Sequence, residues 1–157
     1  MLTGSRLERL LKYDPETGIF NWRRYRKGVA GWDNGNRYVQ ITVDQKHYLA
    51  HRLAWLWMTG RWPEHEIDHI DGNSSNNAFR NLRCATSTQN KANTGARSRS
   101  LSGLKGASWH KSSRKWRSRI RIGDREIFLG MFNTAEEAGA AYFAAAKTHF
   151  GEFARAS

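Results

Sequence analysis

The pattern of hydrophobic and polar residues predicts a hairpin followed by a helix in the N-terminal half of the chain. Residues 38–43 (Tyr-Val-Gln-Ile-Thr-Val) alternate with a period of two, which is typical of a strand with one buried face. The polar run 44–46 predicts a turn, and residues 47–49 a returning strand. Residues 53–58 (Leu-Ala-Trp-Leu-Trp-Met) predict a helix that ends at Gly60.

A second, shorter pair of strands follows. Residues 66–70 and 81–84 predict strands that pair across a polar loop. Residues 86–93 then predict a helix, because Thr86 and Gln89 have the spacing of a capping box.

The C-terminal part predicts a three-stranded sheet and one helix. Strands are expected at 106–111, 115–122 and 126–132, the last two joined by a tight Gly-Asp turn. An alanine-rich helix begins at Thr134, runs to about residue 150, and can approach a sheet closely. The expected fold class is therefore α+β.

A change of composition divides the chain. Residues 94–104 are small, polar and cationic without a hydrophobic period, which predicts a flexible basic linker. We therefore expect a domain at residues 1–93 and a second one at residues 105–157.

Charge narrows the range of partners. The net charge is +12, and residues 94–157 carry twelve Lys and Arg against five Asp and Glu. Such a surface attracts polyanions, so double-stranded nucleic acid is the expected partner. A single cysteine excludes a disulfide framework and a cysteine-based zinc site. No apolar run is long enough to span a membrane and no signal sequence is recognised, so we expect an intracellular monomer that binds no membrane and no small-molecule cofactor.

Four residues between positions 68 and 90 suggest phosphodiester chemistry. Asp68 and Asn90 offer oxygen atoms, which suit a hard cation such as Mg²⁺ or Mn²⁺. His69 titrates near neutrality and can accept a proton from water. Asn81 either orients the imidazole or bonds the backbone to hold the fold together. Because adjacent strand residues point to opposite faces, Asp68 and His69 can share a site only if the strand end is twisted.

These residues, in this order and spacing, resemble the HNH endonucleases of the ββα-metal group, particularly the phage and intron-encoded homing type. The resemblance covers residues 66–93. It implies that His69 is the general base and that Asp68 and Asn90 hold one divalent cation near the leaving 3′-oxygen. The alternative is that the Asp-His pair is incidental, the Asp-Gly-Asn run only a turn and the asparagines only caps. We favour the nuclease because all parts occur together.

The second C-terminal strand suggests a DNA-binding face. Arg117, Arg119 and Arg121 alternate with Trp116, Ser118 and Ile120, so one face is cationic and the other packs on the helix. The basic face is enlarged by Ser108, His110, Arg114, Lys115 and Arg125. The alternative, a merely solvated face, is less favoured because neighbouring strands supply few acids to pair with these arginines.

Residues 103–154 resemble the AP2 DNA-binding domain, through Gly-Leu-Lys-Gly, Trp-Arg-Ser-Arg-Ile-Arg and Phe-Leu-Gly-Met-Phe-Asn-Thr-Ala-Glu-Glu-Ala. The resemblance implies a DNA-facing sheet with the helix behind it. It assigns contacts to Ser108, His110, Arg117, Arg119, Arg121, Glu126 and Phe128.

Together these features predict a metal-dependent HNH endonuclease of homing type, targeted by an AP2 domain and acting in a bacterial host, with a phage as the expected source. The alternatives are a DNA-binding regulator whose HNH fold does not cut, and a phage packaging factor that binds DNA without sequence preference.

Overall fold

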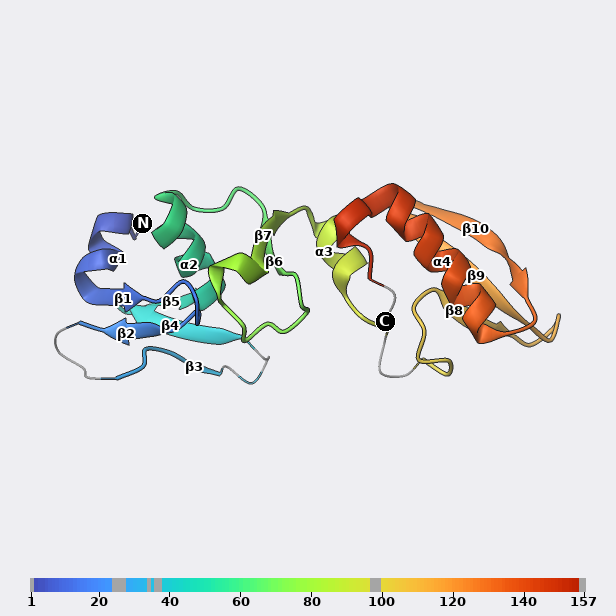
Figure 1. Ribbon diagram of the computed structural model, residues 1–157, viewed down its shortest axis with the longest axis horizontal. Helices are drawn as coiled ribbons and strands as arrows, with labels where there is room; N and C mark the ends of the chain where they lie inside the picture. Colours follow the sequence, from blue (N-terminus) through green and yellow to red (C-terminus); the bar gives the residue numbers. More distant parts are fainter. Residues whose placement is uncertain (1, 24–27, 34, 36–37, 97–99, 156–157) are drawn as a thin grey trace. The chain divides into compact units, whose positions relative to one another are not determined.

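The chain forms two compact units of mixed helices and small antiparallel sheets. A computed structural model describes residues 2–23, 28–33, 35, 38–96 and 100–155. The units comprise Met1–Ala85 and Thr86–Ser157 (Figure 1). No helix in the described ranges has the length and apolar character needed to cross a membrane.

The first unit begins with two small sheets. The opening elements are α1 (Gly4–Leu10), β1 (Leu11–Tyr13) and β2 (Phe20–Trp22), and β1 pairs with β2. Next come β3 (Trp32–Asp33), β4 (Val39–Val43) and β5 (Lys46–Leu49), which form a sheet with β4 in the middle. The helix α2 (Ala50–Thr59) follows, and Gly60 ends it in the left-handed conformation. The predicted hairpin and helix are confirmed, whereas β3 was not predicted.

The core of this unit lies between α2 and the small sheets. Leu7, Leu11, Ile41 and Leu53 are fully buried, and Phe20 is almost so. These side chains come from α1, β1, β4, α2 and β2, so the core joins elements that are distant in sequence. The same core includes Ile67 and Leu82, which belong to the next hairpin.

That hairpin carries the residues singled out in the sequence. β6 (Glu66–His69) pairs antiparallel with β7 (Leu82–Ala85), and Asp68 lies opposite Arg83. The predicted pairing of the two strands is confirmed. A short 3-10 helix, η1 (Phe79–Asn81), precedes β7 and was not predicted.

A close backbone approach holds the loop between β6 and β7 against the N-terminal segment. Gly18 has φ +74°, and a Cβ atom there would lie 2.2 Å from the carbonyl carbon of Asn77. The Tyr13 hydroxyl donates to the Asn77 carbonyl at 2.7 Å, and the Phe79 amide donates to the Pro15 carbonyl at 2.8 Å. Glycine is needed at position 18 because both the space and the backbone conformation exclude a side chain.

Replacing Gly18 by alanine should therefore destabilise the first unit. We expect the free energy of unfolding to fall by on the order of 3 kcal/mol, from backbone strain and overpacking together. Thermal or urea unfolding measures this. Gly60→Ala is the matched control, since Gly60 has φ +72° but nothing within 4 Å of a built Cβ. Equal losses in the two variants would show that the approach to Asn77 does not contribute.

The second unit consists of α3 and a three-stranded sheet covered by α4. Its elements are α3 (Ser87–Asn93), β8 (Ala107–His110), β9 (Lys115–Ile122), β10 (Arg125–Phe132), α4 (Ala135–Phe150) and the 3-10 helix η2 (Gly151–Phe153). β9 lies between β10 and β8, and both pairings are antiparallel. The predicted strands, the capping box of α3 and the start of α4 after Thr134 are confirmed.

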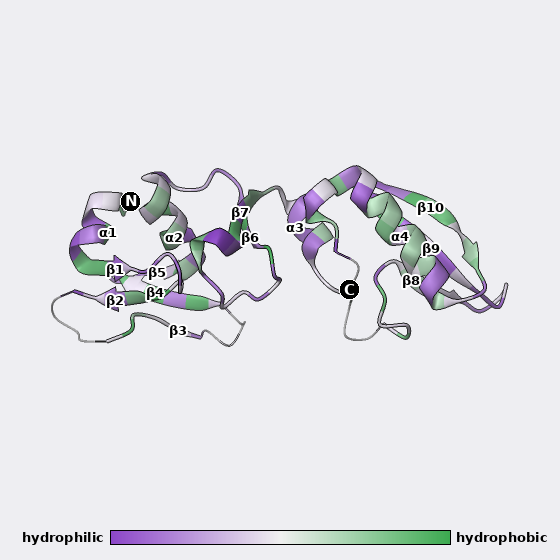
Figure 2. Cartoon of the chain, viewed as in Figure 1, coloured by the Kyte–Doolittle hydropathy of each residue, from purple (hydrophilic) through white to green (hydrophobic). Residues whose placement is uncertain are grey.

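One face of this sheet packs on α4 (Figure 1). Ser118 and Ile120 of β9 are buried, as are Tyr142 and Ala146 of α4. Figure 2 shows the middle of α4 in the green of hydrophobic residues and its two ends in purple. The predicted alternation along β9 is confirmed in its middle, where Ser118 and Ile120 are buried and the arginines on either side of them are more exposed.

The segment predicted as a linker makes contacts of its own where the structure describes it. A Cβ atom on Gly139 of α4 would lie 3.2 Å from the Leu104 side chain. The Ser102 hydroxyl donates to the Ala107 carbonyl at 3.3 Å. Residues 97–99 of the predicted linker lie outside the described residues. The division into domains at residues 93 and 105 stays a prediction.

Candidate active site

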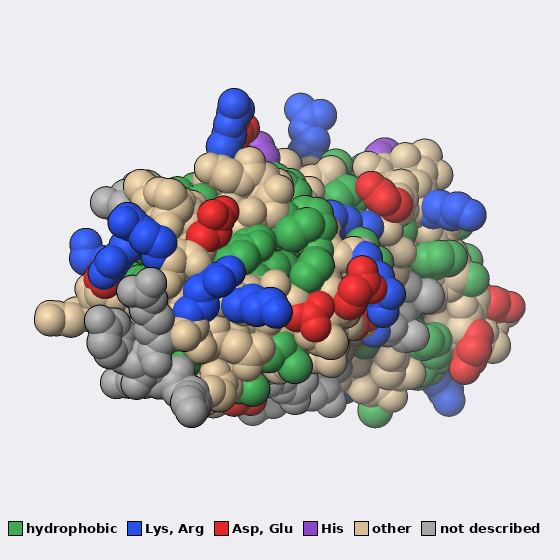
Figure 3. Space-filling view, turned by 60° about the vertical axis from the view of Figure 1, so that its left-hand side comes forward, with side chains coloured by type: hydrophobic (Ala, Val, Ile, Leu, Met, Phe, Trp, Pro, Cys, Tyr) green, Lys and Arg blue, Asp and Glu red, His purple; other side chains and the backbone are tan. Residues whose placement is uncertain are grey.

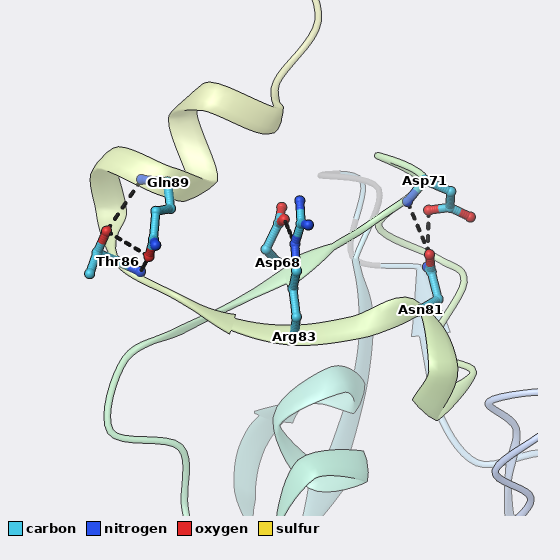
Figure 4. Close-up of polar contacts among 6 residues, drawn as sticks. All are labelled: Asp68, Asp71, Asn81, Arg83, Thr86 and Gln89. Atoms are coloured by element: carbon cyan, nitrogen blue, oxygen red, sulfur yellow. Dashed lines mark hydrogen bonds and ion pairs between the residues drawn. The ribbon is translucent and has the colours of Figure 1, made fainter. Parts of the chain in front are cut away.

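Asp68 is buried beside a cation. It is 3% exposed, and its Oδ2 accepts a hydrogen bond from Nε of Arg83 at 2.8 Å. The two side chains project from the same side of the β6–β7 ribbon (Figure 4). Removing one partner of such a buried pair is costly, because the other charge is left uncompensated. Arg83 was not among the predicted site residues, although its position opposite Asp68 follows once the strand register is known.

His69, the last residue of β6, is held by an amide from the loop. Its Nε2 lies 3.2 Å from Oδ1 of Asn77, while Nδ2 of Asn77 donates to the Ser75 carbonyl at 3.2 Å. The second bond sets the orientation of the amide, so Oδ1 is the acceptor and Nε2 of His69 carries the proton. The neutral imidazole then has its lone pair on Nδ1, the nitrogen that can accept a proton from water.

Two further rings surround the His69 imidazole. The ring centroid of His51 lies 5.0 Å away at nearly a right angle, and that of Tyr38 lies 6.2 Å away. Burial lowers the pKa of His51 to about 3, so this neighbour stays neutral near pH 7. Burial also lowers the pKa of His69 below its usual value, although one hydrogen bond and two carboxylates act in the opposite direction. The lowered pKa of His69 favours the neutral form, which is the form that accepts a proton.

This shift sets an expectation for the pH dependence of cleavage. A base acts only when deprotonated, so the rate should fall as pH falls through the pKa of His69. Because that pKa is lowered, the midpoint of the acidic limb should lie below the usual histidine value of about 6.5. A pH series of single-turnover cleavage rates measures it. A midpoint above 6.5 would contradict this account of His69.

Asn81 orders the loop after β6. Its Oδ1 accepts from the Asp71 backbone N–H at 3.0 Å, and its Nδ2 donates to Asp71 Oδ1 at 2.9 Å (Figure 4). The same Nδ2 donates to the Asn76 carbonyl at 2.9 Å. The sequence left two roles open for Asn81, orienting the imidazole or bonding the backbone. In the structure its side chain bonds the backbone of the loop. The observed partner of the imidazole is Asn77, which sequence reasoning missed. Its only signal was an asparagine-rich loop at 73–77.

Asp68 and His69 are both buried, but their described neighbours differ. Asp68 accepts a hydrogen bond from Arg83 on β7, whereas His69 contacts the His51 ring and Asn77. Asn90 lies on α3, in the second unit, where its backbone N–H donates to the Thr86 carbonyl at 2.9 Å. The assignment of the four residues to one site thus stays a prediction.

The donor chemistry fits a hard divalent cation. Asp68 offers a carboxylate and Asn90 an amide oxygen, the ligand types preferred by Mg²⁺ and Mn²⁺. Within the described ranges, no group of three or more His, Cys, Asp or Glu gathers in a way that could hold a metal ion. Two protein oxygens are nevertheless a usual number for Mg²⁺, which keeps several waters or phosphate oxygens.

The predicted DNA-binding residues lie on the sheet of the second unit and its turns. β8 carries Ser108 and His110, the following turn carries Arg114, β9 carries Lys115, Arg117, Arg119 and Arg121, and β10 carries Arg125, Glu126 and Phe128. Phe128 is 59% exposed, a large apolar side chain facing solvent.

One arginine of this face has an acidic partner. Nη1 of Arg119 lies 2.6 Å from Oε1 of Glu126 on the neighbouring strand. We expected too few acidic residues on the neighbouring strands to pair with these arginines, and for Arg119 this expectation was wrong. Elsewhere in the chain, Figure 3 shows basic and acidic side chains interspersed on the face that it presents.

Comparison with known proteins assigns a family to the segment that contains α2, the β6–β7 hairpin and most of α3. Residues 48–92 match the family model described as HNH endonuclease. That range contains Asp68, His69, Asn81 and Asn90. A relative, Protein 3.8 of Escherichia phage T7, is 34% identical over 106 residues, which cover 67% of this chain and 87% of the relative.

Proposed function

The chain belongs to the HNH endonuclease family, and from this premise we propose that it is a divalent-metal-dependent enzyme that hydrolyses phosphodiester bonds of duplex DNA. The observation that carries the proposal is the state of His69. Its imidazole is buried, its Nε2 lies 3.2 Å from Oδ1 of Asn77, burial lowers its pKa, and the residue directly follows Asp68 in the chain.

The proposed reaction is an attack by water on phosphorus. His69 Nδ1 accepts the proton of the water as its oxygen bonds to phosphorus and the bond to the 3′-oxygen breaks. Asp68 and Asn90 hold one Mg²⁺ or Mn²⁺, which when bound supplies positive charge at the leaving oxygen. Asn81 contributes indirectly, because its three bonds order the loop from which Asn77 reaches His69.

We propose that the sheet of the second unit targets the enzyme, as an AP2-like DNA-binding domain in an enzyme of homing type. Support comes from the arginines of β9 on the face opposite α4 and from the exposed Phe128. A two- or three-stranded ribbon can enter the major groove and contact both phosphates and base edges.

A plasmid-nicking assay tests the proposed function. Supercoiled DNA is incubated with the protein at several Mg²⁺ or Mn²⁺ concentrations, with EDTA and with the His69→Ala variant as controls. Metal-dependent cutting by the wild-type chain alone supports the proposal. If the wild-type chain binds DNA but does not cut it, the result would instead indicate a DNA-binding regulator whose HNH fold does not cut. If random and selected duplexes also bind equally well, it would indicate a packaging factor that binds DNA without sequence preference.

Arg119 tests whether the sheet reads bases. Its ion pair with Glu126 fixes the direction of the guanidinium, and Lys at this position keeps the charge without the planar fork. We expect Arg119→Lys to cost about 1–3 kcal/mol on the preferred sequence and much less on random DNA. Binding-site selection measures this, with Arg61→Lys, at an exposed arginine of the first unit, as the control. An unchanged preferred sequence would remove base reading from Arg119.

A further inference from the structure

A single lysine closes the C-terminal end of α3. Nζ of Lys105 donates to the carbonyls of Lys91 at 2.8 Å, Ala92 at 2.7 Å and Thr94 at 2.7 Å. An ammonium group has three donors, and all three are used here. The last carbonyls of a helix have no partner within the helix and carry its negative dipole end, so a cation is well suited to this position.

α3 depends on such outside support. It spans only Ser87–Asn93, and a helix of this length is not stable by itself in water. Its first turn is held by the capping box of Thr86 and Gln89. The Lys105 ammonium holds the other end, so Asn90 lies between two fixed ends.

Lys105 is itself held firmly by its chain neighbours. Leu104 packs on Gly139 of α4, at 3.2 Å from a built Cβ. Gly106 has φ +79°, and a Cβ atom there would lie 2.2 Å from the ring of Tyr142. The ammonium also lies 5.7 Å from the centroid of that ring. The lysine therefore connects α4 with α3.

Burial of the ammonium has a measurable signature. It lowers the pKa of Lys105 to about 8, with a smaller contribution from the positive charge of Arg155. A lysine is rarely kept in such surroundings unless its bonds compensate for the loss of water. The three carbonyls provide that compensation.

We propose that Lys105 is a positioning residue that fixes α3 against α4, and thereby presents Asn90 for metal binding. The inference rests on the proposed role of Asn90 as a ligand. The helix that carries Asn90 is thus held by the same unit that carries the sheet.

The test measures Mn²⁺ binding by the full-length chain, from the loss of the free-ion electron paramagnetic resonance signal, and the Mg²⁺ dependence of cleavage. Lys105→Met removes the ammonium and keeps most of the stem. We expect the Kd for Mn²⁺ and the Mg²⁺ concentration for half-maximal cleavage to rise about tenfold or more, as for loss of a group that orients a ligand. Lys105→Arg, with several donors, should restore most of the affinity. Lys111→Met, which removes an exposed lysine of the same unit, should leave Mn²⁺ binding unchanged.

Unchanged Mn²⁺ binding in Lys105→Met would overturn the proposal. Weaker duplex binding in that variant, with normal Mn²⁺ affinity, would overturn it too and assign the lysine to phosphate contact. If Lys105→Met does not fold, Lys105→Gln decides, because its amide can still donate to two carbonyls. An intermediate loss of about threefold to tenfold supports the proposal, and wild-type affinity contradicts it. A wild-type chain that neither binds Mn²⁺ nor cuts DNA would instead refute the proposed function itself.

Discussion

Replacing His69 by alanine is expected to lower the rate of DNA cleavage by about 10²–10⁴-fold, the usual loss when a general base is removed. The imidazole is 6% exposed, and its Nε2 lies 3.2 Å from Oδ1 of Asn77. Single-turnover cleavage at saturating DNA measures the effect. Duplex affinity should change little, because the sheet of the second unit is untouched.

His65→Ala is the matched control for that experiment. The His65 side chain is exposed, and the backbone carbonyl of this residue accepts a hydrogen bond from Arg52. Its cleavage rate should equal that of the wild-type chain. A His69→Ala variant that cuts at the normal rate would remove His69 from the mechanism.

Replacing Asp68 by alanine is expected to have two separable effects. The first is loss of metal-dependent cleavage, or a strongly raised Mg²⁺ requirement, because a proposed ligand is gone. The second is a loss of about 3–5 kcal/mol in the free energy of unfolding, because Arg83, 12% exposed, keeps a buried charge without its carboxylate.

The double variant Asp68→Ala/Arg83→Met separates these effects. Removing both charges should restore much of the stability, since an apolar replacement of a buried ion pair is often tolerated. Cleavage should stay lost, because the ligand is still absent. Chemical unfolding and plasmid nicking measure the two properties on the same preparations. Recovery of cutting in the double variant would show that Asp68 acts only through the stability of the hairpin.

The sequence by itself determined most of the local structure. The alternation at 115–122 appears as β9, with Ser118 and Ile120 buried against α4, because a period of two places every second side chain on one face. The N-terminal ends of α3 and α4, at Thr86 and Thr134, could also be predicted, because a capping box joins residues only three positions apart. The HNH motif was visible for a related reason: its residues keep a short, ordered spacing that the family match also covers.

Only the tertiary structure decided which polar groups meet. Asn77 and Asn81 are both asparagines near the same turn, and sequence spacing gives no reason why the first bonds His69 and the second the loop backbone. Lys105 reads as part of a basic segment, yet its ammonium caps α3. Such choices depend on side-chain direction and strand register across a folded core, and contacts between distant parts of a chain leave no periodic trace in its sequence.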